Sequence, residues 1–384
     1  MITITKPFLP PLQEYEAYLA DIWQRGWVAN NGPLVVELET KIKHYLDSPA
    51  MLFVNNGTMA LQVAIKALGL QGEIITTPFS FIATTSSVLW EKCKPVYADI
   101  DPFTFNIDPA KIEALITPAT TAILATHVFG NPCDIEAIDD IAKRYGLKVI
   151  YDASHCFGVK YKGKSIYAYG DISTASFHAS KLYHTIEGGG IFSGNTALLN
   201  QIAFIRNFGF NGPEHFACTG INAKNSELHA AMGLVNLRYV NDILLKRRQL
   251  YEYYLDCFDG YNVQLQQVSG DAQYNYGYFP VVFQSEQVVK KVLEFLNSND
   301  IYPRRYFYPS LNTLDFVDKQ SCPNSLHISQ CILCLPMYYG LTHKDIDSIV
   351  NIIKSSQALY KKNLPVYNLA DYIEKFNLPA GKRS

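Results

Sequence analysis

Residues 149–158 read VIYDASHCFG, and residues 170–194 read GDISTASFHASKLYHTIEGGGIFSG. Each stretch begins as an apolar strand and continues into polar or glycine-rich residues. In an open α/β sheet, the carboxyl ends of the strands face the ligand crevice. Asp152 ends the first strand, so its position fits a functional carboxylate. It fits equally well the N-cap of a following helix, which is a common place for aspartate.

The same alternation of apolar strands and amphipathic segments extends outward from these stretches, from about residue 50 to residue 195. This pattern is typical of βαβ units and predicts an α/β fold with a mostly parallel central sheet. Asp134 and Gly146 delimit one intervening helix, and Asp108–Pro109 with Pro118 delimit another. We expect strands at 51–54, 73–77, 95–100, 120–128, 147–152 and 172–177.

A long helical stretch is expected from about residue 226 to residue 258, and the sequence pattern changes after it. Beyond it, shorter strand-like and helical segments follow one another, and Thr342 with Asp345 resembles a capping box. We therefore predict an N-terminal arm and a large domain over 1–240, and a smaller α+β domain over 241–384. The last segment, from about residue 356, is a more polar tail without an assigned role.

Composition excludes several classes of protein. The 384 residues are 48% hydrophobic and 18% charged, so the chain can bury a core and is not disordered. A formal charge of −2 gives no basic excess for nucleic acid. No apolar window of membrane-spanning length is present, and the N-terminus, with Lys6 and several prolines, does not resemble a signal peptide. We expect a cytoplasmic protein that binds neither membrane nor nucleic acid.

The eight cysteines are too few in so long a chain for a disulfide framework. The single CxxC, Cys331 and Cys334, lies in the apolar run CILCLPM, which is typical of a strand. Side chains alternate along a strand, so these two thiols would point to opposite faces. We predict no metal site.

Lys181 follows the strand of the second stretch and precedes glycines 188–190. Glycines allow the backbone to approach a ligand or the lysine closely. The surrounding segment is poor in charge, which favours a partly desolvated amine over a solvated surface lysine. Because only about one free lysine in 2500 is uncharged at pH 7, a nucleophilic lysine needs such burial, a nearby cation, or a covalent bond to a carbonyl.

VNNGTMALQVAIKALGL, at 54–70, forms a third element in which a short strand runs through a glycine turn into a helix. Free backbone N–H groups and the Thr58 hydroxyl at such a helix start suit a phosphate. The alternative is that Thr58 only caps the helix. One helix end contributes about 0.3 to 2 kcal/mol, so other groups would have to share the anion.

Together these elements match the needs of pyridoxal 5′-phosphate. A buried Asp152 would keep the ring nitrogen protonated, and Lys181 would bond to the aldehyde and later move the substrate proton. Phe81 in the loop TPFSFIATT would pack on the ring. Ser176 would add a hydroxyl to the phosphate.

At these residues the chain resembles the DegT/DnrJ/EryC1/StrS family of sugar aminotransferases, over roughly residues 5–355. The resemblance implies the fold type I architecture of pyridoxal-phosphate enzymes, which is like that of aspartate aminotransferase. Its most specific motif is SFHASK followed by EGGG, and DASH and NNGTMAL also match. The cofactor-site residues that it implies are Gly57, Thr58, Phe81, Asp152, His155, Ser176 and Lys181.

Two further segments extend the resemblance. GINAKNSELHAAMG resembles the stretch whose asparagine, here Asn222, reaches the cofactor phosphate of a neighbouring subunit, which implies a homodimer with shared active sites. Lys224 stands where the family usually has arginine, and the two are not equivalent for bidentate anion contacts. YPRRYFYP places Arg304 at a position for which we expect a substrate contact.

The resemblance also implies a reaction. The family's dehydratase branch replaces the reactive lysine with histidine, so Lys181 favours transamination. The stretches KPFLPPLQEY, GWVANNGP, TTPFSFIATT and HVFGNPCD resemble the subgroup that aminates C4 of dTDP-4-keto-6-deoxy-D-glucose. The resemblance implies L-glutamate as the amino donor, with 2-oxoglutarate and dTDP-4-amino-4,6-dideoxy-D-glucose as products. The cofactor then alternates between pyridoxal and pyridoxamine 5′-phosphate. The product of such enzymes serves surface polysaccharides such as the O-antigen of lipopolysaccharide.

Three alternatives stay open at the level of sequence. The first is amination at C3, or of another nucleotide-linked 4-keto sugar, because no sequence feature identifies the carbon. The second is a non-catalytic sensor that binds the cofactor or a sugar nucleotide. The third is a scaffold protein, from which visible absorbance of a bound cofactor would distinguish an enzyme.

Overall fold

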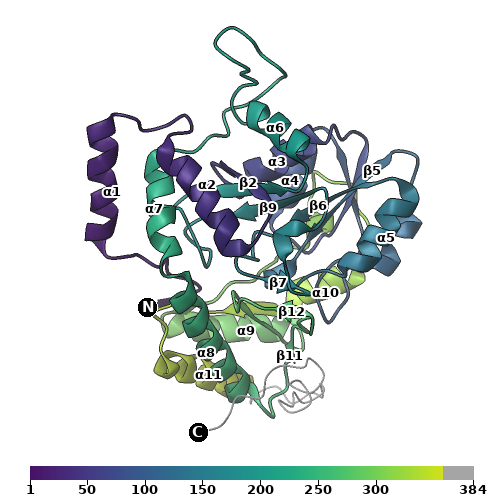
Figure 1. The fold of residues 1–384 in the computed structure, drawn as a ribbon. Coiled ribbons are helices and arrows are strands. Elements are labelled where there is room, and N and C mark those ends of the chain that lie inside the picture. Colours follow the sequence, from purple (N-terminus) through teal and green to yellow (C-terminus); the bar gives the residue numbers. More distant parts are fainter. Residues whose placement is uncertain (358–384) are drawn as a thin grey trace.

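A mixed β-sheet forms the centre of the molecule in the computed structural model, which describes residues 1–357 (Figure 1). The strand order is β2-β10-β9-β6-β5-β3-β4. Strands from β9 to β4 run parallel to one another, whereas β10 is antiparallel to both its neighbours. The predicted α/β fold with a mostly parallel sheet is confirmed. The bounds are β2 Ala50–Val54, β3 Glu73–Thr76, β4 Lys94–Tyr97, β5 Thr120–Thr126, β6 Lys148–Asp152, β9 Ile172–Ser176 and β10 Gly189–Ser193.

Both faces of this sheet are covered by helices because its strands carry apolar residues on both sides. In β5, Ile123 and Ala125 point to one face, where α2, α5 and α7 pack. Ala122 and Leu124 point to the other face, where α3 and α6 pack. The bounds of the helices on this part of the chain are α1 Leu12–Arg25, α2 Pro33–Leu46, α3 Gly57–Ala67, α4 Ile82–Trp90, α5 Ile135–Tyr145, α6 Thr196–Ile205 and α7 Glu227–Leu237.

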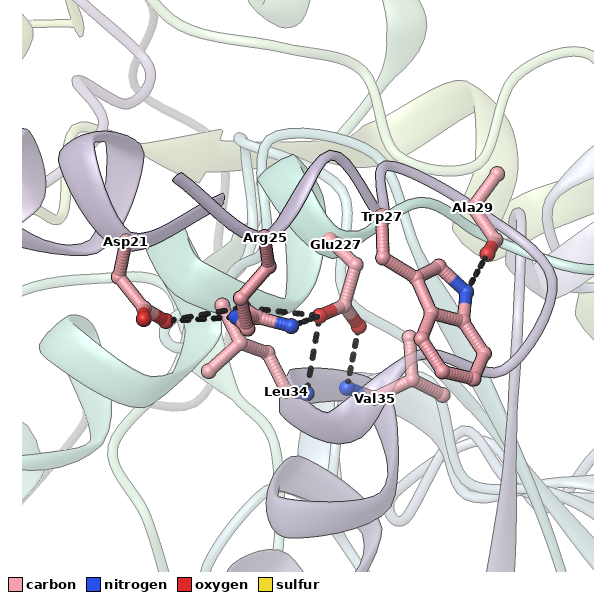
Figure 2. A network of polar contacts seen from close by, with 7 residues as sticks. All are labelled: Asp21, Arg25, Trp27, Ala29, Leu34, Val35 and Glu227. Carbon is pink, nitrogen blue, oxygen red and sulfur yellow. Dashed lines mark hydrogen bonds and ion pairs between the residues drawn. The ribbon is translucent and has the colours of Figure 1, made fainter. Parts of the chain in front are cut away.

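The N-terminal arm is attached through α7. Helix α1 lies beside α7 at the edge of the molecule (Figure 1). Glu227, the first residue of α7, is fully buried and accepts hydrogen bonds from the backbone N–H groups of Leu34 and Val35 in the first turn of α2 (Figure 2). Arg25 at the end of α1 pairs with the same carboxylate at 3.2 Å. One buried side chain therefore joins α1, α2 and α7.

A second apolar core lies around the antiparallel sheet β11-β13-β15. Helix α8 contributes Val240 and Ile243 to the core of the large sheet and Leu250 to Phe258 to the second core.

The domain boundary at residue 240 stays a prediction, and the tail from about 356 lies almost wholly outside the described residues. The bounds are α8 Val240–Phe258, β11 Gln264–Leu265, β13 Phe279–Val282, α9 Glu286–Ser298, α10 Pro323–Cys331, β15 Ile332–Leu335 and α11 His343–Gln357.

Short strands tie the two parts together. β12 pairs with β7, β7 pairs with β8, and β1 at the N-terminus pairs with β14. No helix within residues 1–357 combines the length and apolar character needed to cross a membrane. The bounds are β1 Ile2–Thr3, β7 Lys160–Tyr161, β8 Lys164–Ser165, β12 Ala272–Gln273 and β14 Ile301–Tyr302, with 3-10 turns at Pro109–Lys111, Glu113–Leu115, Val128–Gly130, Ile166–Ala168 and Leu311–Thr313.

Two predicted helices differ from the structure. The segment from Pro109 to Pro118 forms two 3-10 turns, whose bonds, such as Ile112 N–H to the Pro109 carbonyl, span three residues. The long stretch from residue 226 is interrupted because Tyr239, with φ −103° and ψ −2°, separates α7 from α8. Strand β10 was not among the predicted strands.

Candidate active site

A cavity of about 680 Å³ opens at the carboxyl ends of the parallel strands. β5, β6 and β9 contribute their last residues, Thr126, Asp152 and Ser176, to its wall. The loops after β2 and β3 and the segments around residues 278 and 306 complete the lining. The expectation that Asp152 faces a crevice at the strand ends therefore agrees with the structure.

Asp152 is buried and surrounded by neutral hydrogen-bond donors. Its Oδ1 accepts the N–H of Ser154 at 3.1 Å in a turn, not in a helix, so the helix-cap alternative does not hold. Its Oδ2 accepts the hydroxyl of Thr84 at 3.3 Å. No Lys, Arg or His within residues 1–357 forms an ion pair with it. A buried carboxylate satisfied only by neutral donors suits a cationic group in the cavity.

Lys181 lies in the same cavity, with its Nζ 3.4 Å from the hydroxyl of Tyr278. Burial lowers the pKa of the Lys181 amine, and the nearby Asp152 carboxylate opposes that shift. The amine makes no ion pair with any described residue. A lysine with a lowered pKa and no ion pair is a candidate nucleophile.

His155 is a neutral aromatic wall of the cavity. Its Nδ1 accepts the N–H of Phe129 at 3.1 Å, which places the ring proton on Nε2. The ring stacks on Phe307 with centroids 5.9 Å apart and 4° between the planes. Burial and the charge of Lys181 lower its pKa well below the usual range. The flat, uncharged ring next to Asp152 and Lys181 suits contact with a planar ligand.

The turn between β2 and α3 forms another wall. Asn56 caps α3 by accepting the N–H of Met59 at 2.8 Å, so the alternative that Thr58 is the cap is wrong. Thr58 lines the cavity. A Cβ at Gly57 would lie 2.9 Å from the Cβ of Ser176. The backbone of Gly189 in β10 also approaches this turn so closely that a side chain there would meet the Asn56 carbonyl. Gly57, Thr58 and Ser176 are thus brought together as expected of an anion cradle.

Two predicted residues lie at the more open part of the cavity. Phe81, just before α4, lines it with 55% of its surface exposed. Arg304 is also exposed and lines it. The Arg304 backbone pairs with Cys334 in both directions, at 3.2 and 2.8 Å, which fixes its position relative to β15.

Asn222 does not line this cavity. It is exposed, and its Oδ1 accepts a hydrogen bond from Lys224 Nζ at 2.9 Å. Lys224 Nζ also lies 4.4 Å from the ring centroid of Phe208. The role expected of Asn222 concerns a neighbouring subunit, so it stays a prediction.

Several lining residues were not predicted from the sequence. Tyr278, Tyr306 and Phe307 lie in the tyrosine-rich segments YNYGYF and YPRRYFYP, whose aromatic density is a usable signal. Arg247 lies on α8, spaced as the core residues Ile243 and Leu250 are, so helical periodicity would have placed it inside. Thr84, which does not line the cavity but donates a hydrogen bond to Asp152, was also not predicted, because nothing in the sequence distinguishes it.

No cluster of His, Cys, Asp and Glu side chains able to hold a metal ion occurs within residues 1–357. Cys331 ends α10, whereas Cys334 lies within β15, and both are buried free thiols. The functional groups that line the cavity are the Lys181 amine, the Asp152 carboxylate, the anion cradle and the aromatic side chains.

Comparison with known proteins identifies proteins that are similar to this chain in sequence or in fold. A dTDP-4-amino-4,6-dideoxy-D-glucose transaminase of Shigella dysenteriae is 40% identical over 362 residues, covering 92% of this chain and 98% of the relative. An enzyme of the same name from Escherichia coli is 37% identical over 366 residues, with the same coverage. The crystal structure of DesI with its TDP-sugar product superposes with a TM-score of 0.87 at 27% identity, covering 98% of this chain and 94% of DesI. Residues 12–354 match the family model, and the chain belongs to the DegT/DnrJ/EryC1/StrS aminotransferase family.

Proposed function

We propose that this protein transfers the amino group of L-glutamate to C4 of dTDP-4-keto-6-deoxy-D-glucose, forming dTDP-4-amino-4,6-dideoxy-D-glucose and 2-oxoglutarate. The observation that carries the proposal is the buried Lys181 amine, which forms no ion pair with a described residue, in a cavity that also holds the buried Asp152 carboxylate. The sugar itself is inferred from the names of the relatives from Shigella dysenteriae and Escherichia coli.

Members of this family use pyridoxal 5′-phosphate, and the residues of the cavity fit it. Gly57 and Thr58 at the start of α3 and Ser176 at the end of β9 would hold the phosphate, and glycine at position 57 allows this close approach because a side chain there would collide with Ser176. Asp152, which forms no ion pair with a described residue, would face the ring nitrogen. When bound, the cofactor supplies an aldehyde that takes up the amino group and a ring that accepts electron density during proton transfer.

Three residues of the chain would carry out the proton transfers and hold the cofactor ring. The Lys181 Nζ would accept the proton from the Cα of the amino donor and deliver a proton to C4 of the sugar. The lowered pKa of this amine favours the neutral form that can act as a base. Asp152 would hold the ring nitrogen in its protonated state through its negative charge. His155 would keep the ring plane fixed and, being neutral, would not compete for that charge.

We further propose that the protein acts in the cytoplasm as a homodimer and that its product enters a surface polysaccharide such as the O-antigen. The exposure of Asn222, outside its own cavity, supports an action on a neighbouring subunit. The nucleotide-linked sugar named for the two similar transaminases supports the biosynthetic role.

Incubation of the purified protein with cofactor, ¹⁵N-labelled glutamate and dTDP-4-keto-6-deoxy-D-glucose tests the function. We expect one ¹⁵N atom in the sugar nucleotide by mass spectrometry and its attachment at C4 by NMR. The Lys181→Ala variant is the matched control and should form none. Nitrogen at C3, or no amino sugar with active enzyme on an isomeric keto sugar, would contradict the proposed substrate.

A further inference from the structure

Arg247 is a buried arginine that lines the cavity from α8. Only 4% of its surface is exposed. Its Nη1 donates a hydrogen bond to the carbonyl of Gly277 at 2.9 Å, and its Nε is buried without a partner. No described residue accepts a hydrogen bond from Nη2, so this group remains as a donor for a ligand in the cavity that Arg247 lines.

The charge of Arg247 is unbalanced within the described part of the chain. Arg206 is equally buried, at 4% exposure, but pairs with Glu39 at 2.6 Å. Arg305, which is largely buried, pairs with Glu286 at 2.9 Å. No carboxylate of residues 1–357 lies within ion-pair distance of Arg247. A buried charge without a counter-ion is costly, so an anion that enters the cavity would be bound strongly.

The position of Arg247 narrows the choice of anion. Its hydrogen-bond acceptor, Gly277, immediately precedes Tyr278, whose hydroxyl lies 3.4 Å from Lys181 Nζ. The phosphate cradle belongs to a different wall, where α3 meets β9. The pyrophosphate of a sugar nucleotide carries a nucleoside that needs the open side of the cavity, where the exposed Arg304 lies. A compact carboxylate fits the buried guanidinium better than either.

We propose that Arg247 binds a carboxylate of the amino donor and thereby distinguishes the donor from the keto sugar, which uses the same cavity in the other half of the reaction. This assignment rests on the proposed transamination. A guanidinium suits a carboxylate because its planar fork donates two parallel hydrogen bonds. Arg247 is then a specificity-determining residue for the donor.

The test compares Arg247→Met and Arg247→Lys with the wild-type holoenzyme. Steady-state kinetics give KM for L-glutamate and KM for the keto sugar, and calorimetry gives the affinity for 2-oxoglutarate. We expect Arg247→Met to raise KM for glutamate roughly 30-fold or more, as for loss of a buried charge partner, with KM for the sugar unchanged. Arg247→Lys should give a smaller rise, because lysine keeps the charge but lacks the fork.

Arg248→Met is the matched control, because this neighbour on α8 is 40% exposed and pairs with Glu252 on the surface. It should change neither KM. Single-turnover release of 2-oxoglutarate from glutamate needs no sugar, so the donor assignment is tested even if the proposed sugar is wrong. If Arg247→Met does not fold, Arg247→Lys provides the test. Its KM for glutamate should rise relative to its KM for the keto sugar, and an unchanged ratio of the two KM values would contradict the proposal.

Three results would overturn the proposal: an equal rise in both KM values, a rise confined to the sugar, or weaker binding of pyridoxal 5′-phosphate with unchanged affinity for 2-oxoglutarate. The second result would assign Arg247 to the pyrophosphate, and the third would assign it to the cofactor.

Discussion

At the scale of single residues, Asp152 and Lys181 could be predicted because Asp152 ends an apolar strand and Lys181 follows another, and both strands end at the crevice. The hydroxyl of Thr58 was ambiguous in the sequence, since asparagine and threonine both cap helices. The structure resolves it because Asn56 takes the cap. Arg247 and Tyr278 were missed because they lie far from Lys181 in the sequence, and only folding brings them to the same cavity.

His127 provides a residue-scale prediction of acid lability. Its ring is fully buried, its Nδ1 accepts the N–H of Cys133 at 3.0 Å, and its Nε2 has no partner. Burial lowers the pKa of His127 from 6.5 to about 3. Between pH 6.5 and about pH 3, His127 is protonated in the unfolded chain but neutral in the folded chain. The free energy of unfolding therefore falls as pH falls, by up to about 1.4 kcal/mol per pH unit.

Thermal melting of the His127→Asn variant tests this effect, because the Asn oxygen keeps an acceptor for Cys133 but does not titrate. We expect its melting temperature to fall less steeply than that of the wild type between pH 6.5 and pH 4.5, whatever its stability at neutral pH. His44→Asn, at an exposed site on α2, is the control. If the melting temperatures of the wild type and His127→Asn fall equally steeply with pH, His127 does not contribute to the loss of stability in acid.

At the scale of elements, helix ends with clear local signals were predicted well. The Asp134 side chain accepts the N–H of Ala137 at 3.1 Å, and Gly146 ends α5 in the left-handed conformation. The region after Pro109 has similar signals but forms 3-10 turns, which the residue pattern alone does not distinguish from one α-helix. β10 was missed because glycines are unfavourable in strands, and its Gly189 is required by the contact with the Asn56–Gly57 turn.

The junction of α1, α2 and α7 gives an element-scale prediction (Figure 2). Glu227→Gln replaces one carboxylate oxygen with an NH₂ group that would face a backbone N–H of Leu34 or Val35. It also removes the charge that pairs with Arg25. We expect a loss of about 2–3 kcal/mol in local stability, seen as a lower melting temperature and faster amide exchange at the start of α2.

Asp21→Asn is the control for this junction, because Asp21 pairs with the same Arg25 but is half exposed. Exposed ion pairs contribute about 0–1 kcal/mol, so this change should be nearly neutral. Equal effects of the two substitutions, or unchanged exchange in Glu227→Gln, would contradict the assigned role.

At the scale of the whole molecule, the alternation of strands and helices predicted the sheet, while its order and the placement of β10 depend on long-range pairing. The association of subunits is a proposal that a complementation experiment tests. If Asn222 acts on the neighbouring site, a dimer of one Lys181→Ala chain and one Asn222→Ala chain has one complete site. Random pairing then restores about a quarter of the wild-type sites.

Coexpression of the two inactive variants with different affinity tags measures this directly, since tandem purification isolates the mixed dimer. We expect activity in the mixed dimer that neither variant has alone. A chain carrying both substitutions, paired with Lys181→Ala, is the control and should stay inactive. An inactive mixed dimer would place the action of Asn222 within its own subunit, and an Asn222→Ala variant that is active alone would place Asn222 outside the reaction.

The central claim is that the Lys181 amine is the reactive group of the cavity. The most direct measurement is borohydride reduction of the protein in pyridoxal 5′-phosphate, followed by peptide mass spectrometry. We predict one stoichiometric cofactor adduct, on Lys181, that prior incubation with glutamate prevents. An adduct mainly on another lysine, or none on protein that is active, would contradict the claim.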